Sequence, residues 1–293
     1  MNNNFRYIIA GILIFLIILL QPIYLKWLGY DSKAVSDEFV PNTSEIVISP
    51  NLAIDEKFDN PTFKSEILES FITIVTPLYT ATISNRAGGS LNRYVLTQLS
   101  AENYKYKGGY DEYGVFNGDI PVSLLLSTEN YCQPCLAVYD DREDQYAFLN
   151  APFQLVDSFG ISDTIFLYPG ESTALKYVLY DVDGNVLIQK SLSFSADNFI
   201  SHHDFTVNED YFDYINNLEF MWTGGLRPSE KRADEDVQYS SGIISQAGEI
   251  EDLQVKGPDK NIDRTIYNGQ TDWAAIRTKY FISALLTKTP GSF

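Results

Sequence analysis

The sequence is poor in the residues on which most enzymes and metal sites depend. Among 293 residues it has only 2 cysteines and 2 histidines. It contains no G-x-S-x-G nucleophile elbow, no H-E-x-x-H zinc motif and no phosphate-binding loop. A glycine-rich run at 86–90 joins two strand-like segments and opens no helix, so it predicts a hairpin turn and not a phosphate site. We therefore predict no catalytic residue, no cofactor and no metal, and a protein that is not an enzyme.

The two cysteines, Cys132 and Cys135, are separated by Gln and Pro. A C-x-x-C run can be a redox pair, half of a zinc site or a local disulfide. Residues 136–139 predict a strand, whereas a reactive thiolate needs a helix N-terminus to lower its pKa. The histidines, His202 and His203, are neighbours and would point to opposite faces of a strand, so they would not complete a zinc site. A possible disulfide or two free thiols are favoured over a functional thiol pair.

Basic residues are also scarce, with 21 Lys and Arg against 39 Asp and Glu and a formal net charge of -18. Such a chain would repel a phosphate backbone, so no nucleic acid is expected among its partners. The acidity is typical of an exposed domain that must stay soluble. An acidic docking face for a basic partner is the alternative.

Aromatic and β-branched residues are abundant by contrast, with 20 Tyr and 18 Phe, and they favour strands. From residue 71 onwards apolar runs alternate with Gly, Pro and Asn turns, which predicts many short strands and an all-β body. A helical pattern downstream is limited to a short charged stretch at 229–237.

One strand is predicted in detail from its alternation. Four apolar residues within it share one parity: Val186, Ile188, Leu192 and Phe194. This period of two indicates a strand with one buried face. Residues 181–185 predict the hairpin turn before it. Their D-x-D-x-N pattern lacks the twelve-residue frame of a calcium loop, so a turn is favoured over a calcium site.

Near the N-terminus, residues 7–25 carry no charge and are long enough to cross a hydrocarbon core of about 30 Å as a helix. Trp27 and Tyr30 follow, where aromatic rings favour the membrane interface. We favour an uncleaved anchor over a cleaved signal peptide, for which 32–34 would be the cleavage site. The positions that represent the anchor are Tyr7, Gly11, Leu16, Leu20 and Leu25.

The chain divides by composition into an anchor at 1–30, a flexible linker at 31–70 that is rich in Ser, Asp, Glu, Asn and Pro, and a β domain at 71–286. A tail at 287–293 follows. Lys and Arg counts alone leave the orientation of the anchor open.

Four blocks of the sequence resemble the YidC family of bacterial membrane protein insertases. They are WTGGLRPSEK at 222–231, GEIEDL at 248–253, GQTDWAAIRTKYFISAL at 269–285 and VTPLYTATISNRAGGSLN at 75–92. With the anchor, the resemblance covers nearly the whole chain. The matching motif residues are Trp222, Gly225, Leu226, Asp272, Trp273, Arg277, Tyr280 and Phe281.

The resemblance implies a β-supersandwich related to galactose-mutarotase-like domains, in the periplasm, with the N-terminus in the cytoplasm and the chain in the cell inner membrane. Family members insert and fold membrane proteins alone or with the Sec translocon. Implied partners are the translocon and its accessory proteins, nascent membrane proteins and the lipid bilayer. The alternatives are a membrane-anchored carbohydrate-binding or mutarotase-like domain, and an anchored thiol oxidoreductase.

The sequence departs from the family pattern at its end. The family's insertase activity resides in a C-terminal bundle of transmembrane helices with a hydrophilic groove and a basic residue, whereas only the tail at 287–293 follows residue 286. We therefore expect a truncated chain that does not catalyse insertion by itself. The resemblance also places Trp273 and Phe281 in the core of the last strand, where replacement by Ala would cost about 3 kcal/mol or more.

Overall fold

The computed structural model describes residues 67–111, 113–125, 132–140, 145–156, 162–208, 218–254, 267 and 269–291. These residues are mostly in β-strands, which confirms the all-β class. The helix α3 (Ala233–Tyr239) overlaps the charged stretch at 229–237 that the sequence singles out. In the segments described, no helix combines the length and apolar character needed to cross a membrane. The predicted anchor, with Tyr7, Gly11, Leu16, Leu20 and Leu25, lies outside them.

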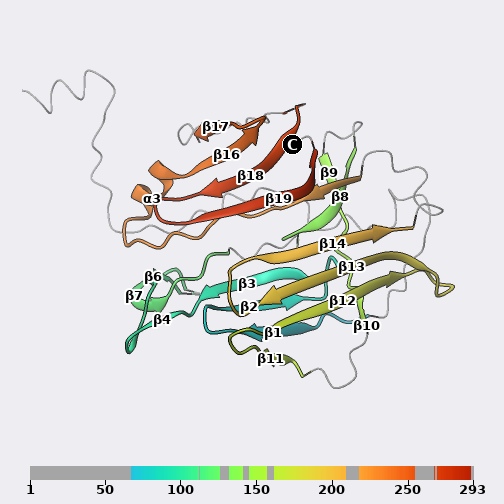
Figure 1. Cartoon of the computed structure of the whole chain (residues 1–293), viewed down its shortest axis with the longest axis horizontal. Coiled ribbons are helices and arrows are strands. Elements are labelled where there is room, and N and C mark those ends of the chain that lie inside the picture. Colours follow the sequence, from blue (N-terminus) through green and yellow to red (C-terminus); the bar gives the residue numbers. More distant parts are fainter. Residues whose placement is uncertain are drawn as a thin grey trace, which may run out of the picture. The chain divides into compact units, whose positions relative to one another are not determined.

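The first sheet has the order β11-β1-β2-β3 (Figure 1). Hairpin connections make β1, β2 and β3 antiparallel neighbours, and β11 joins β1 in parallel. The strands are β1 (Phe71–Val75), β2 (Tyr79–Ser84), β3 (Ser90–Leu96) and β11 (Thr164–Phe166).

The second sheet is antiparallel throughout, with the order β10-β12-β13-β14. The strands are β10 (Gln154–Val156), β12 (Ser172–Tyr180), β13 (Val186–Ser195) and β14 (Ser201–Val207). The long β12–β13 hairpin is closed by the predicted turn. There the Asp181 carboxylate accepts hydrogen bonds from the backbone N–H groups of Asp183 and Asn185, at 2.9 and 2.8 Å.

The predicted alternation of β13 is confirmed for Ile188, Leu192 and Phe194, which are buried. It is wrong for Val186, which is 43% exposed, while Leu187 is buried. The register explains the change of face. Tyr180 pairs with Val186 and the preceding residue of β12 pairs with Ile188, so Leu187 is an extra residue in a β-bulge.

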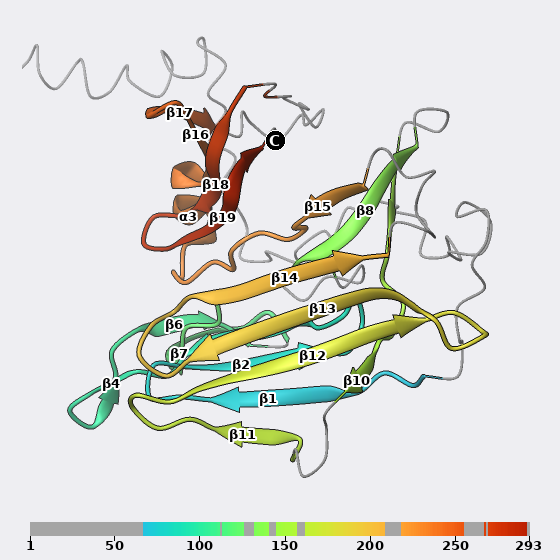
Figure 2. The same cartoon turned by 45° about the vertical axis from the view of Figure 1, so that its right-hand side comes forward.

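The first and second sheets lie face to face in both views (Figure 1 and Figure 2). Their inner side chains form one apolar core, to which Ile74 and Ile83 contribute from one sheet and Leu175 and Leu192 from the other. Tyr79 spans the two layers, because its hydroxyl donates to the Ser195 carbonyl at 3.0 Å. The core therefore holds the two sheets in a fixed arrangement.

A third sheet has the order β15-β8-β9, and a C-terminal sheet has the order β17-β16-β18-β19. The third-sheet strands are β8 (Cys135–Asp140), β9 (Gln145–Phe148) and β15 (Leu218–Met221). The C-terminal strands are β16 (Ser241–Gln246), β17 (Glu249–Gln254), β18 (Thr271–Arg277) and β19 (Ile282–Gly291). The pairing of β19 with β18 extends to Gly291.

Two short hairpins complete the described strands. They are β4 (Leu99–Ser100) with β5 (Asn103–Tyr104), and β6 (Lys107–Tyr110) with β7 (Phe116–Pro121).

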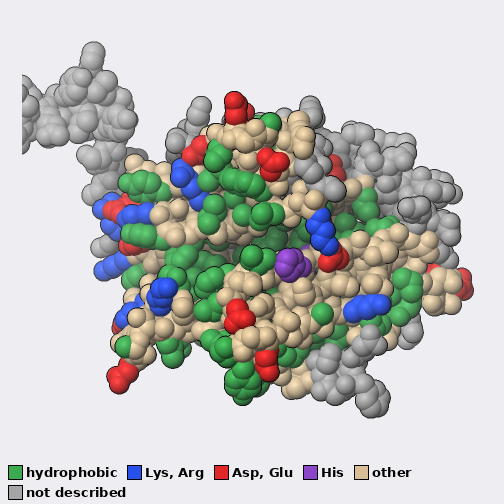
Figure 3. Space-filling view, viewed as in Figure 1, with side chains coloured by type: hydrophobic (Ala, Val, Ile, Leu, Met, Phe, Trp, Pro, Cys, Tyr) green, Lys and Arg blue, Asp and Glu red, His purple; other side chains and the backbone are tan. Residues whose placement is uncertain are grey.

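Charged side chains are dispersed over the face drawn in Figure 3, where acidic groups lie among basic and neutral ones. On this face they do not gather into an acidic block. This face therefore does not show the acidic docking face that the composition left as an alternative.

Candidate functional site

The glycine-rich run forms the predicted hairpin turn between β2 and β3. Gly89 has φ +99°, a conformation that L side chains rarely adopt. A Cβ atom on this residue would stand 2.8 Å from side-chain carbons of Leu192 and of Tyr177. The turn therefore requires glycine for its backbone conformation and for its close approach to the second sheet.

Lys190 enters this turn from β13, on the core-facing side of the strand, and has no exposed surface. Its Nζ donates hydrogen bonds to three carbonyl oxygens, those of Ala87 at 3.2 Å, Gly89 at 2.9 Å and Pro134 at 2.7 Å. Burial lowers the pKa of Lys190 well below its usual value. Three acceptors match the three N–H groups of an ammonium, and the Phe205 ring centroid lies 4.8 Å away, so these contacts favour the charged form.

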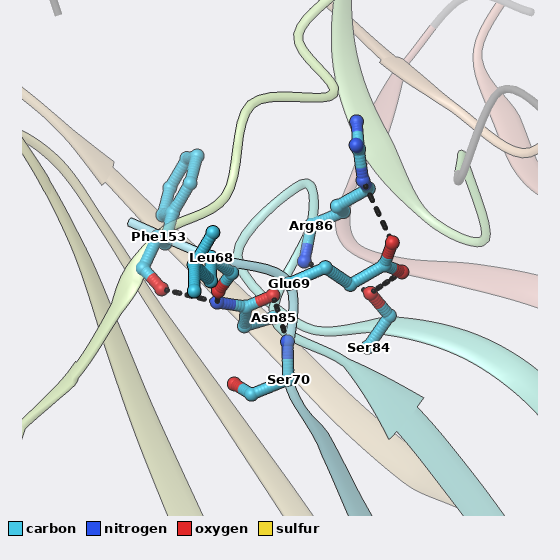
Figure 4. Close-up of polar contacts among 7 residues, drawn as sticks. All are labelled: Leu68, Glu69, Ser70, Ser84, Asn85, Arg86 and Phe153. Carbon is cyan, nitrogen blue, oxygen red and sulfur yellow. Dashed lines mark hydrogen bonds and ion pairs between the residues drawn. The ribbon is translucent and has the colours of Figure 1, made fainter. Parts of the chain in front are cut away.

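A second polar cluster lies around Asn85 and Arg86, at the start of the same turn (Figure 4). The Asn85 side chain accepts from the Ser70 N–H at 3.0 Å and donates to the carbonyls of Leu68 and Phe153, at 3.0 and 3.3 Å. Glu69 pairs with Arg86 at 3.2 Å. These contacts hold residues 68–70 against the β2–β3 turn.

Cys132 and Cys135 form a disulfide, and both are fully buried. Strand β8 starts at Cys135, as the sequence predicts for the residues that follow the pair. The loop that the disulfide closes contains Pro134, one of the three acceptors of Lys190. The cysteines thus stabilise the loop that holds the buried ammonium, which agrees with a local disulfide and leaves neither sulfur as a thiol.

The first group of motif residues connects the third sheet to the core. Trp222 is partly buried against the main core, and Leu226 is buried and bridges to Leu125. Gly225 lies between them and is half-buried. These positions have a packing role.

The second group lies on the β18–β19 hairpin and does not fill a core as expected. Trp273 and Phe281 are only partly buried, and Tyr280 is 56% exposed. Asp272 accepts from the Ser245 hydroxyl at 3.4 Å, and Arg277 donates to the Ser241 hydroxyl at 2.8 Å.

The core placement of Trp273 and Phe281 is therefore corrected. Phe281 packs from the β18–β19 turn against the edge of the main core, whereas Trp273 lies on the C-terminal sheet, outside that core. Partial burial removes less apolar surface from water, so each Ala replacement should cost less than the 3 kcal/mol expected from the sequence.

His202 and His203 point to opposite sides of β14, as predicted, so they form no pair. His203 Nε2 lies 2.9 Å from the Ser201 hydroxyl, and its buried Nδ1 has no hydrogen-bond partner among the described residues. Burial first, and then the charges of Lys190 and His202, hold the pKa of His203 well below its usual value. No group of three or more potential metal ligands occurs in the described segments.

Sequence reasoning did not identify Lys190, His203 or Asn85 as important. Lys190 shares the parity of the apolar positions of β13, which is the signal that could have revealed a buried cation. Its acceptors are about 50 to 100 residues away in the chain, so local sequence does not show them.

The fold and the cluster around Lys190 define a class of protein: an all-β domain whose buried polar groups hold loops and sheets together. Comparison with known proteins shows which proteins the chain is similar to. The chain is 25% identical to the membrane protein insertase YidC of Chlorobaculum tepidum, over 95% of this chain and 44% of that protein. For YidC of Chloroherpeton thalassium the identity is 25%, over 80% and 38%. For YidC of Nitratidesulfovibrio vulgaris it is 23%, over 98% and 49%.

These similarities confirm the resemblance found from the sequence motifs: the chain is similar to YidC insertases. It spans less than half of the length of these curated relatives. No family model matches the chain. No solved structure matches it either.

Proposed function

We propose that this chain forms the membrane anchor and periplasmic β domain of a YidC-type insertase, in which it serves as a non-enzymatic interaction and chaperone module. The observation that carries the proposal is the similarity to YidC insertases over 80 to 98% of the chain. The all-β body supports it, and a β-supersandwich is the architecture proposed for the two facing sheets.

The uncharged run at 7–25 supports placement in a membrane. The cell inner membrane as its location, with the N-terminus in the cytoplasm, is proposed from the resemblance to YidC. A linker from residue 31 to the ordered contacts near residue 68 would carry the domain away from the bilayer. Proposed partners are nascent membrane proteins, the Sec translocon with its accessory proteins, and lipid. The chemistry of insertion is assigned to parts of the relatives that this chain does not cover.

Topology is tested by labelling single introduced cysteines in intact bacterial cells with a membrane-impermeant maleimide. Both native sulfurs are in the disulfide, so Glu102→Cys, at an exposed position, supplies a reactive thiol. Asn3→Cys, on the other side of the anchor, is the matched control. We expect Glu102→Cys to react in intact cells and Asn3→Cys only after permeabilisation. The reverse pattern would overturn the periplasmic placement.

The chaperone role is tested with defined ribosome-bound nascent chains. A photoreactive amino acid at exposed Tyr280 should crosslink the nascent chain of a membrane protein and not that of a soluble protein of equal length. The same group at exposed Tyr168, on the loop after β11, is the control. Equal crosslinking of both nascent chains, or of neither, would contradict the role.

A further inference from the structure

The loop that the disulfide closes, residues 132–135, is buried throughout. We call it the disulfide loop. Its backbone polar groups are directed to distant parts of the chain. The Gln133 carbonyl accepts from the Leu91 N–H at 2.9 Å, and the Gln133 N–H donates to the Ser90 hydroxyl at 3.1 Å. The disulfide loop is therefore attached to the start of β3 in the first sheet.

The disulfide loop is also attached to the other two sheets that meet there. The Cys132 carbonyl accepts from the Thr223 N–H at 2.7 Å and from the Thr223 hydroxyl at 3.1 Å, just after β15 of the third sheet. The Pro134 carbonyl accepts from Lys190 Nζ, on β13 of the second sheet, at 2.7 Å. This is the shortest of the three hydrogen bonds of that ammonium. Three sheets are thus joined through four residues.

A disulfide across so few residues acts mainly on the folded state. The entropy that a cross-link removes from the unfolded chain grows with the length of the closed loop, and a C-x-x-C loop is among the shortest. The disulfide instead holds the carbonyls of Cys132 and Pro134 where their donors need them. With two thiols the loop could move, and a fully buried ammonium that loses one of its acceptors costs free energy.

We propose that Cys132 and Cys135 are a substrate for oxidation by a disulfide donor, and that their oxidation completes the acceptor site of Lys190. The disulfide and the hydrogen bonds of Lys190 then stabilise one another. In a reducing cytoplasm the pair would be two thiols, so the domain would reach its full stability only in an oxidising compartment. The inference rests on the proposed function only for the periplasm as that compartment.

The reaction is thiol–disulfide exchange. The thiolate of one cysteine attacks a sulfur of the donor disulfide, which forms a mixed disulfide and releases one donor thiolate. The thiolate of the other cysteine then attacks the sulfur of the first and releases the second donor thiolate. The chain loses two electrons and two protons, and the donor becomes a dithiol. Both sulfurs are fully buried in the folded domain, so the exchange takes place while the disulfide loop is open.

The test compares the oxidised and the reduced full chain in detergent micelles. The unfolded, reduced chain is refolded either with oxidised glutathione as the disulfide donor or with reduced dithiothreitol alone, and urea unfolding is followed by circular dichroism. Reduction should raise the equilibrium constant for unfolding in the wild-type chain. In Lys190→Met the rise should be about tenfold smaller, because the disulfide loop no longer holds an acceptor for an ammonium.

Ile74→Val is the matched control. Ile74 is fully buried in the main core, in a different apolar cluster from the two cysteines. Its replacement should lower stability but leave the effect of reduction as large as in the wild-type chain. An equal effect of reduction in the wild-type chain and in Lys190→Met would overturn the proposal, as would no effect of reduction in the wild-type chain.

If the reduced wild-type chain does not fold, the native oxidised chains decide. Dithiothreitol reaches the buried disulfide only when the disulfide loop opens, and the Lys190 contact opposes that opening. We expect Lys190→Met to be reduced about tenfold faster than the wild-type chain, and Ile74→Val to be reduced at nearly the wild-type rate. Equal rates for Lys190→Met and the wild-type chain, or equal acceleration in both variants, would contradict the coupling.

The outcome is separable from that of the proposed function. The redox comparison uses the purified chain and needs neither a nascent chain nor a particular topology, so it could succeed if the crosslinking and labelling tests failed. A periplasmic chaperone would still pass those two tests if its disulfide were not coupled to Lys190.

Discussion

At the scale of single residues, Lys190 directs its three hydrogen bonds to backbone carbonyls. Its three acceptors come from the β2–β3 turn and from the disulfide loop, and the residue itself comes from β13. One side chain therefore joins three segments that are far apart in the sequence. The geometry satisfies each N–H of an ammonium, which is what makes a fully buried cation tolerable in a domain of this size.

Replacing Lys190 with Met should destabilise the domain by about 3 kcal/mol. The new side chain has a similar length but no donor, so the carbonyls of Ala87, Gly89 and Pro134 would remain buried without their partner. Urea unfolding of the full chain in detergent micelles, followed by far-UV circular dichroism, measures the change.

Lys176→Met is the matched control, because Lys176 lies on the neighbouring strand β12 and is not fully buried. We expect it to change the free energy of unfolding by less than about 0.5 kcal/mol. Equal effects of the two replacements would show that the three hydrogen bonds of Lys190 contribute nothing specific.

His203 should make the domain less stable in mild acid. Its folded-state pKa is held well below its usual value, mainly by burial. Below the unfolded-state pKa of about 6.5 the unfolded chain binds more protons than the folded one, so stability falls as pH falls. The loss should reach about 2 kcal/mol at pH 5. Urea midpoints measured from pH 7 to pH 5 test this.

The comparison that isolates the effect is His203→Gln against His202→Gln. His203→Gln should flatten the pH dependence, since the buried titrating group is gone. His202 is a minor cause of the lowered pKa of His203, whose main cause is burial, so His202→Gln should change the slope less than His203→Gln does. An unaltered slope in both variants would mean that carboxylates alone set the acid response.

At the scale of elements, the β2–β3 turn is fitted to the second sheet. Gly89→Ala should destabilise the domain by about 3 kcal/mol, because the added methyl would meet Leu192 and Tyr177 and because φ is +99°. Gly184→Ala in the β12–β13 turn shares a positive φ of +87° but has open space around it. It should cost only about 1 kcal/mol.

Both alanine variants place a side chain at a positive φ. The difference between their unfolding free energies therefore reports the overpacking around Gly89 alone. Thermal unfolding of the full chain in detergent, with both variants in one series, provides the measurement. If Gly184→Ala were as damaging as Gly89→Ala, the close approach of the turn to the second sheet would not matter.

The periodicity of apolar residues predicts which segments form strands better than it predicts which side of each strand is buried. It places Ile188, Leu192 and Phe194 of β13 inside, but it cannot reveal that Leu187 is an extra bulge residue, because the bulge depends on the pairing with β12. It also gives no reason for Lys190 to be inside, since the acceptors belong to other segments.

The motif blocks show the same limit. The block at 269–285 was expected to form one last strand, whereas it contains β18, the turn and the start of β19. Resemblance also does not tell which side of this hairpin is covered. Trp273 was expected in a core and instead lies among exposed Ile250 and Leu286. Burial of a strand depends on what packs over the sheet, and that information is not local.

At the scale of the whole molecule, acidic residues are in large excess. The chain carries a formal charge of -18, and Arg277, Lys279 and Lys288 of the β18–β19 hairpin are each paired with a carboxylate. The excess of negative charge should affect stability, because like charges are closer together in the folded chain than in the unfolded one.

Adding salt at pH 7 should therefore stabilise the domain. Raising NaCl from about 0.01 to 0.15 M shortens the Debye length from about 30 to 8 Å, which screens repulsion among the excess carboxylates. Near pH 4.4, the isoelectric point given by the sequence, net repulsion vanishes and the same addition should have little effect. Urea unfolding of the full chain in a nonionic detergent, at both salt concentrations and both pH values, measures this. A fall in stability with salt at pH 7 would show that ion pairs such as Glu69–Arg86 outweigh the general repulsion.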